Sequence, residues 1–251
     1  MHCSSSSTKL VLSLAAISFF NSYNTAEITG PNCTGNTCTI TNDQTGTIQI
    51  QGHNSTNSLT IQKDATLTNT ANLISITEKA IHVYGSNTDM LNVTTILNKG
   101  TINGNIYIGI WRGNEGNIII DNFENTKDIH SPNVNGVFFE GNVQVKNFNN
   151  KGTIIGATHA SGVKIAQKND KSVTIENFNN EGTIGSKDSV FGIMMHGSKE
   201  SKPIITNFNN SGKLLGANKS VFIKMALLLI STIQASLTQN IMPLYFKQEV
   251  K

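Results

Sequence analysis

The sequence predicts an all-β protein, a right-handed parallel β-helix, on three observations. One phrase occurs three times, as NFNNKGTIIG at 147–156, NFNNEGTIG at 177–185 and NFNNSGKLLG at 207–216. Apolar and polar residues alternate on both sides of each copy, which is typical of strands with one buried face. Charged residues make up only 14% of the chain, and the abundance of Asn, Gly, Thr and Ile favours turns and short strands.

Residues 1–26 have the layout of a secretory signal peptide. Lys9 precedes an apolar run from Leu10 to Phe20, and small and polar residues follow it. The run is too short to span a membrane as a helix, and we expect cleavage after Ala26. A buried N-terminal helix is the alternative interpretation.

Residues 27–45 are expected to cap the N-terminal end of the β-helix. Cys33 and Cys38 flank a Gly-Asn turn in CTGNTC, and in an exported protein such a pair predicts a small local disulfide loop. A metal site would need further ligands, but the sequence has neither a paired histidine motif nor a Cys-x-x-Cys to supply them.

Residues 46–220 are predicted to form the coils. When the copies of the phrase are aligned on their Phe, similar residues fall at similar offsets: an apolar pair before the Phe, an Ile or Leu six residues after it, and then a further apolar strand. The aligned residues are Phe123, Phe148, Phe178 and Phe208, and a weaker copy occupies 91–104. Units of 20–50 residues that cannot bury their own apolar faces indicate a solenoid, and the repeat has no helical period.

Stacking of successive coils about 4.8 Å apart explains the repeated residue types. The four Phe are expected to form an internal aromatic column. A turn is expected before each Phe, with hydrogen-bonded columns of Asn beside it: Asn122, Asn147, Asn177 and Asn207 before the Phe, and Asn125, Asn150, Asn180 and Asn210 after it. Gly152, Gly182 and Gly212 are expected to take positive φ in the next turn. Recognition must then come from residues that vary between the copies.

Residues 221–251 depart from the pattern. They lack Asn-Gly turns and contain a nearly continuous apolar run from Met225 to Ile233. We expect an irregular tail. A closing cap, built as a strand or a helix, and the product of a frame change or truncation remain open as alternatives.

The sequence indicates no catalytic, cofactor-binding or metal-binding residues. Carboxylates that act on one substrate should occupy equivalent offsets on adjacent coils, but the position two residues before the Phe holds Asp121, Lys146, Glu176 and Thr206. Glu124 lies on the coil of Asp121, and a single pair of this kind is more typical of a solvated face. The histidines fall at unrelated offsets, namely His53, His82, His130, His159 and His196.

Two further features bear on binding. The segment GIWRGNEG at 109–116, with Trp111 and Arg112, is either an exposed contact patch or an ordinary turn between coils. The net charge of +3 is small, and the lysines of the chain are scattered without forming a basic stripe, which argues against a nucleic-acid partner.

The signal-like core KLVLSLAAISFF, the following AEITGPNCTGNTCTI and the NFNNxGTI coils resemble the passenger region of autotransporter adhesins of Gram-negative bacteria. The resemblance covers residues 9–220. It implies a right-handed β-helix that reaches the outer surface through a C-terminal membrane β-barrel and that adheres to host cells or matrix. Residues 221–251 depart from the family because they cannot supply such a barrel. We therefore expect this chain alone to reach the periplasm, with surface export depending on a barrel that it does not encode.

Together these observations predict a non-enzymatic, monomeric, cofactor-free passenger, a truncated one, that acts in surface adhesion or as a structural stalk. Its expected partner is the host-cell surface or matrix. A stand-alone periplasmic or secreted solenoid is the first alternative. A β-helix polysaccharide lyase or hydrolase that acts through Asp121 or Glu124 is the second, and turnover of an acidic polysaccharide would distinguish it.

Overall fold

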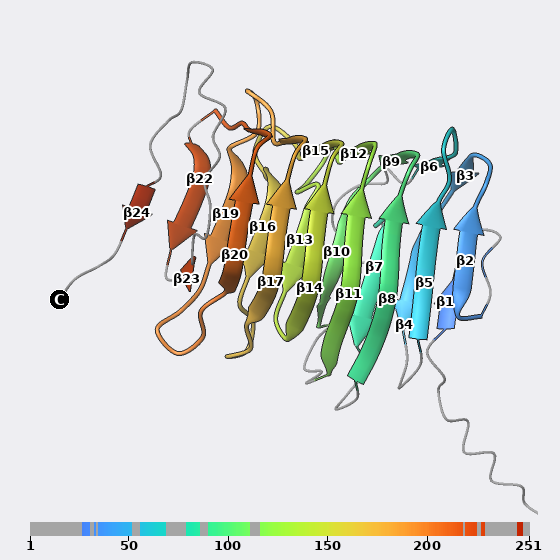
Figure 1. The fold of residues 1–251 in the computed structure, drawn as a ribbon, viewed down its shortest axis with the longest axis horizontal. Helices are drawn as coiled ribbons and strands as arrows, with labels where there is room; N and C mark the ends of the chain where they lie inside the picture. Colours follow the sequence, from blue (N-terminus) through green and yellow to red (C-terminus); the bar gives the residue numbers. More distant parts are fainter. Residues whose placement is uncertain are drawn as a thin grey trace, which may run out of the picture.

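The computed structural model describes residues 27–30, 33, 35–51, 56–68, 79–85, 90–110, 116–217, 219–224, 227–228 and 245–247. Their strands form three sheets around one core, and the predicted parallel β-helix is confirmed. In Figure 1 the chain rises through the front sheet, crosses the top and descends behind, while successive coils advance from right to left. This sense of rotation makes the helix right-handed. The predicted signal peptide, residues 1–26, lies outside the described residues.

The first sheet, at the front of Figure 1, takes one strand from each coil and carries the repeated phrase. Its strands are β2 (Thr37–Ile40), β5 (Thr56–Ile61), β8 (Met90–Asn98), β11 (Asn117–Asn125), β14 (Val143–Asn150), β17 (Val173–Asn180), β20 (Ile204–Asn210) and β23 (Leu227–Leu228). Neighbouring strands pair in parallel, with Phe148 opposite Phe123 on one side and Phe178 on the other. The alignment of the copies on Phe is therefore the register of this sheet.

The second sheet consists of short strands at the top of Figure 1. They are β3 (Gln44–Thr45), β6 (Thr66–Thr68), β9 (Thr101–Asn103), β12 (Asp128–His130), β15 (Thr153–Ile155), β18 (Thr183–Ile184) and β21 (Lys213–Leu214). Four strands of this sheet, β9, β12, β15 and β18, each contribute one fully buried Ile, and Leu214 packs against the same core.

The third sheet closes each coil at the back. Its strands are β1 (Glu27–Thr29), β4 (Ile48–Gln51), β7 (Ile81–Gly85), β10 (Ile106–Ile110), β13 (Val137–Glu140), β16 (Ser161–Ala166), β19 (Phe191–His196), β22 (Lys219–Lys224) and β24 (Tyr245–Lys247). β1 pairs antiparallel with β4, whereas the other strands of this sheet pair in parallel.

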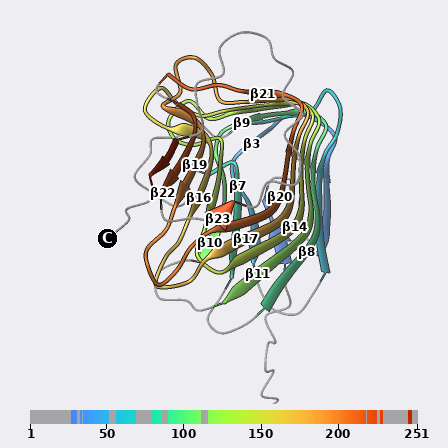
Figure 2. The same cartoon turned by 60° about the vertical axis from the view of Figure 1, so that its left-hand side comes forward.

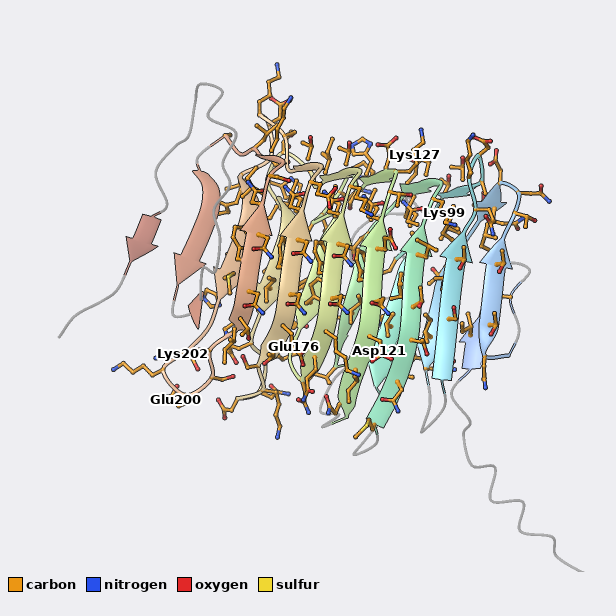
Figure 3. The ribbon with its side chains drawn as sticks, in the orientation of Figure 1. Lys99, Asp121, Lys127, Glu176, Glu200 and Lys202 are labelled. Carbon is orange, nitrogen blue, oxygen red and sulfur yellow. A yellow bond between two sulfur atoms is a disulfide. The ribbon has the colours of Figure 1, made fainter. Side chains whose placement is uncertain are left out.

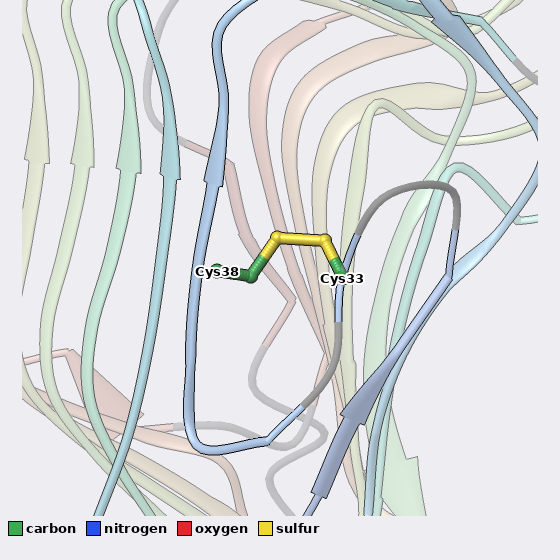
Figure 4. Close-up of a disulfide and its surroundings, with 2 residues drawn as sticks. All are labelled: Cys33 and Cys38. Atoms are coloured by element: carbon green, nitrogen blue, oxygen red, sulfur yellow. A yellow bond between two sulfur atoms is a disulfide. The ribbon is translucent and has the colours of Figure 1, made fainter.

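The N-terminal end is closed by β1 and by a disulfide. Cys33 and Cys38 are joined, and each is 3% exposed (Figure 4). The cap is shorter than the expected 27–45, because β2 and β3 already pair in parallel with β5 and β6. The first coil thus begins at Thr37.

At the other end, the β-helix crosses the boundary expected at residue 220. β22 pairs in parallel with β19, placing Val221 opposite Ile193 and Ile223 opposite Met195. β23 and β24 extend the first and third sheets further. The described part of the tail therefore continues the sheets, and most of the predicted apolar run lies outside the described residues.

The repeated Phe side chains form a stacked column in the core. Ring centroids are 5.0 Å apart between Phe123 and Phe148, 4.4 Å between Phe148 and Phe178, and 5.3 Å between Phe178 and Phe208. Phe139, from the third sheet, packs edge-on against Phe148 at 6.0 Å. Offset-stacked and edge-on arrangements are the favourable geometries for aromatic pairs, so the column links two sheets across the core.

The Asn residues form hydrogen-bonded ladders along the stack. In the inner ladder, the side-chain amide of each coil donates to the side-chain oxygen of the next at 2.6 to 2.8 Å, through Asn98, Asn125, Asn150, Asn180 and Asn210. From Asn125 onward, the same amides also donate to the carbonyl two residues further on, as Asn150 does to Gly152 at 3.1 Å, whereas Asn98 donates to the Asp128 carbonyl. Each buried amide is thereby satisfied, as buried polar groups must be.

Two outer ladders run in the opposite direction. Asn147, Asn177 and Asn207 each donate to the corresponding Asn of the preceding coil at 3.0 to 3.1 Å. Asn179 and Asn209 do the same at 2.9 and 2.8 Å. These side chains are only half-buried, so their hydrogen bonds compete with water and contribute less than those of the inner ladder.

The turn expected before each Phe is instead a bend within one continuous strand. In β11, Ile120 and Phe123 point into the core, whereas both residues between them, Asp121 and Asn122, face outward. Two consecutive outward side chains redirect the strand without ending its pairing, and Figure 2 shows this bend in every long strand of the sheet. The prediction of a separate turn was therefore wrong.

Gly152, Gly182 and Gly212 are needed for close approach and not for positive φ. The expected positive φ was wrong, because none of the three lies in the left-handed region. A Cβ at each position would come closer than 3.0 Å to a carbonyl oxygen of the preceding coil, for example that of Gly152 in the case of Gly182. Real Cβ atoms do not make such contacts, so the corner admits only glycine.

Substitution Gly182→Ala should lower the free energy of unfolding by about 1–3 kcal/mol, the usual cost of forcing extra volume into a packed site. The added methyl group would push apart two coils that are joined by the 2.8 Å hydrogen bond from the Thr183 amide to the Gly152 carbonyl. Urea unfolding followed by circular dichroism measures the change. Gly85→Ala is the matched control, since its Cβ would meet ordinary contacts at 3.5 Å. Equal stability of the two variants would refute the close-approach explanation.

Candidate functional site

The carboxylates considered in the sequence are paired with lysines on the outward face of the first sheet. Asp121 lies 2.7 Å from the Lys146 ammonium, and Glu124 lies 3.7 Å from that of Lys151. Asp121 raises the pKa of Lys146 through a hydrogen bond and its charge. Glu176 occupies the next coil on the same side (Figure 3), so carboxylate and ammonium alternate along the stack. This arrangement is a solvated charge ladder, with no two carboxylates converging on one point.

A different group of side chains gathers on the outward face of the third sheet. His82, Tyr107, Phe138 and Lys164 are register partners on four successive coils, and we call them the aromatic row. Ring centroids are 5.4 Å apart between His82 and Tyr107 and again between Tyr107 and Phe138. The Lys164 ammonium lies 4.6 Å from the Phe138 centroid. Tyr84 packs beside the row, 4.6 Å from His82.

Tyr107 is fixed at the centre of the row by polar contacts. Its hydroxyl donates to a carboxylate oxygen of Glu140 at 2.5 Å, and the Lys168 ammonium lies 2.8 Å from the same oxygen. Gly109 provides the space, because a Cβ there would approach the Tyr107 hydroxyl to 2.8 Å. The Lys79 ammonium lies 4.5 Å from the centroid of the tyrosine ring. The ring thus lies beneath Lys79, and its hydroxyl is bound to Glu140, which also binds Lys168.

The environment keeps both titratable rings of the row neutral. Burial, and then the nearby Lys79 charge, lower the pKa of His82 to about 4, so that the imidazole is uncharged at pH 7. Burial raises the pKa of Tyr107, and the hydrogen bond and charge of Glu140 raise it further. A general base needs a pKa near the working pH. The geometry therefore suits contact through neutral rings and ammonium groups better than proton abstraction.

The other sequence candidates do not join this group. His130 and His159 are exposed, and His196 lies at the end of β19. No three His, Cys, Asp or Glu side chains of the described ranges come together as a metal site. His53, Trp111 and Arg112 lie outside the described residues. Within the described part of the chain, no helix is long and apolar enough to span a membrane.

Sequence reasoning missed the aromatic row although a signal for it was present. His82, Tyr107, Phe138 and Lys164 are the middle residues of IHV, IYI, VFF and VKI, between two inward apolar residues. In a strand such middle positions face outward on the same side of the sheet. The four members differ in residue type, so no recurring residue marks the row in the sequence.

Comparison with protein-family models, curated proteins and solved structures finds no match to this chain. The assignment of function therefore depends on the sequence patterns and the geometry described above.

The pKa of His82 predicts a loss of stability in acid. A pKa lowered from 6.5 to about 4 means that the unfolded chain takes up a proton more readily than the folded chain. The stabilisation is present above pH 6.5 and is lost as the pH falls toward 4, by roughly 3 kcal/mol. Unfolding free energies measured between pH 7 and pH 4 should show this fall, and His82→Phe should reduce it. His130→Gln, which alters an exposed histidine, is the control; an unchanged profile in His82→Phe would contradict the prediction.

Proposed function

We propose that the chain is an exported β-helical passenger of the autotransporter adhesin type, which binds host-cell surfaces or matrix or serves as a structural stalk. The observation that carries this proposal is the division between recurring and variable residues. The recurring Phe and inner Asn are buried within the stack, and the recurring Gly permit its tight corners. Apart from the Asn of the outer ladders, most outward residues differ from coil to coil. A solenoid of this kind offers extended faces for many weak contacts.

Two features support export. Residues 1–26 have the sequence layout of a signal peptide. The buried Cys33–Cys38 disulfide suits a protein that folds in an oxidising compartment. We propose that the chain alone reaches the periplasm as a monomer, that it reaches the cell surface or outer membrane through a barrel that it does not encode, and that its partners include neither a cofactor nor nucleic acid.

Expression of the full chain in a Gram-negative host tests export. The exported protein should begin at Glu27, and Cys33 and Cys38 should react with thiol reagents only after reduction. A Cys33→Ser, Cys38→Ser double variant should be exported equally well and should stay unreactive after reduction. Cytoplasmic protein that retains residues 1–26 and carries free thiols would contradict the proposal.

Binding of the exported protein to immobilised matrix proteins and to cultured host cells tests adhesion. We expect saturable binding that survives single substitutions on the outward face of the first sheet, such as Lys146→Gln. Export without binding would favour a stand-alone solenoid. Turnover of a polysaccharide that is abolished by Asp121→Asn would favour an enzyme instead.

A further inference from the structure

We propose that the outward face of the third sheet binds an acidic polysaccharide, a ligand that carries carboxylate or sulfate groups. The inference rests on the proposed binding function and specifies both its face and its ligand class. The site consists of the aromatic row, with Lys79, Tyr84 and Lys168 beside it. Its strands, β7, β10, β13 and β16, lie side by side in Figure 1.

The rings of this face supply a platform for sugars. Across three adjacent coils, the Tyr107 ring contacts His82 on one side and Phe138 on the other. Tyr107 and His82 are only 4% and 2% exposed, whereas Phe138 and Tyr84 are half-buried and are the more accessible rings of this face. Sugar rings present flat C–H faces, and these pack on the electron-rich faces of aromatic rings.

The charges of this face favour an anionic ligand. Lys79 and Lys164 lie over rings of this face, and Lys168 is paired with Glu140, the carboxylate of the group. Glu140 is engaged by both Tyr107 and Lys168. Lys164 forms no ion pair with a described residue, and its ammonium makes a cation–π contact with the Phe138 ring. Complementary charge would attract and orient carboxylates or sulfates along the row.

The site is also preorganised. The hydrogen bond to Glu140 fixes the Tyr107 hydroxyl, and the lack of a side chain at Gly109 leaves room for it. The Tyr107 ring in turn packs edge-on with the Phe138 ring. Rings that are already fixed lose little entropy when a ligand binds. The outward face of the first sheet differs in kind, because Asp121 and Glu124 there neutralise the facing lysines Lys146 and Lys151. The acidic ligand is therefore assigned to the third sheet.

Binding of polysaccharides to the exported full chain tests this assignment. Polygalacturonate and dextran sulfate should bind, neutral dextran of matched length should not, and added salt should weaken the binding. Phe138→Ala should weaken binding about tenfold, as expected for truncation of an aromatic anchor. Phe138→Tyr should retain binding. Lys164→Gln should weaken binding several-fold and reduce its dependence on salt.

Lys146→Gln is the matched control, since it removes a lysine from the first sheet, and it should bind like the wild type. Circular dichroism establishes that each variant is folded.

Equal binding of neutral dextran would overturn the inference, as would absence of binding to both acidic polymers. Equally tight binding of duplex DNA or phosphatidylglycerol vesicles, insensitive to Phe138→Ala, would also overturn it. If the wild type adheres to host cells but binds neither acidic polymer, this inference fails and the proposed adhesion stands. If the wild type binds the polymers but adheres to neither cells nor matrix, this inference stands and the proposed adhesion fails.

Discussion

Phe148→Ala should lower the free energy of unfolding by about 3–5 kcal/mol, the range for truncating a buried Phe. Phe148 is fully buried and contacts three other rings, those of Phe123, Phe178 and Phe139. Its removal would leave a cavity where the column and the third sheet meet. The stacked coils cannot close this cavity, because their spacing is fixed by backbone hydrogen bonds on both sides. Urea unfolding followed by circular dichroism measures the loss.

Phe148→Leu and Thr174→Ala calibrate this result. Leu keeps most of the apolar volume and should cost clearly less than Ala. Thr174 lies in the adjacent strand of the same sheet but its side chain faces outward, so its truncation should change stability by no more than about 0.5 kcal/mol. A loss below about 1 kcal/mol for Phe148→Ala would show that the ring is not packed in an aromatic column.

Asn150→Ala should cost about 2–4 kcal/mol, since unsatisfied buried groups cost about 1–3 kcal/mol each. The Asn150 side chain accepts from Asn125 and donates to Asn180 and to the Gly152 carbonyl. It is 1% exposed, so water cannot replace these partners without opening the stack. Truncation would interrupt the inner ladder and leave the Asn180 side-chain oxygen without its donor. The same unfolding measurement applies.

Asn149→Ala is the matched control for this prediction. Asn149 is the adjacent residue of the same type, but it faces outward in an outer ladder and accepts one hydrogen bond, from Asn179. Water can replace that bond, so the expected loss is below about 1 kcal/mol. If Asn149→Ala and Asn150→Ala proved equally destabilising, the distinction between inner and outer ladders would be wrong.

The coils were predictable because the residues that set their register repeat. Phe148 and Phe178 occupy equivalent places in two copies of one phrase, and in a parallel stack equivalent residues become neighbours. The same reasoning anticipated that Asn150 and Asn180 lie in one column. Recurrence thus reports on positions where each coil contacts its neighbours in the same way, in the core and in the Asn ladders.

The remaining features do not follow from recurrence. The strand bend at Asp121 and Asn122 depends on two consecutive outward side chains, a pattern that in sequence looks like a turn. For Gly182 the sequence shows a glycine but not which property of glycine the fold requires. Tyr107 and Lys164 belong to one row only through the register of the third sheet, because no shared residue type connects them.

The central claim is that the repeated phrases stack as adjacent parallel coils, and engineered cysteine pairs test it most directly. Gln144 is the outward register partner of Thr174, which in turn partners Ile204. Neighbouring coils lie about 4.8 Å apart, within the roughly 4.4–6.8 Å between Cα atoms that a disulfide spans, whereas two coils exceed it. Mild oxidation followed by peptide mapping should therefore join Gln144→Cys to Thr174→Cys, and Thr174→Cys to Ile204→Cys, but not Gln144→Cys to Ile204→Cys. Ready formation of the last bridge, or failure of the first two, would contradict the β-helix.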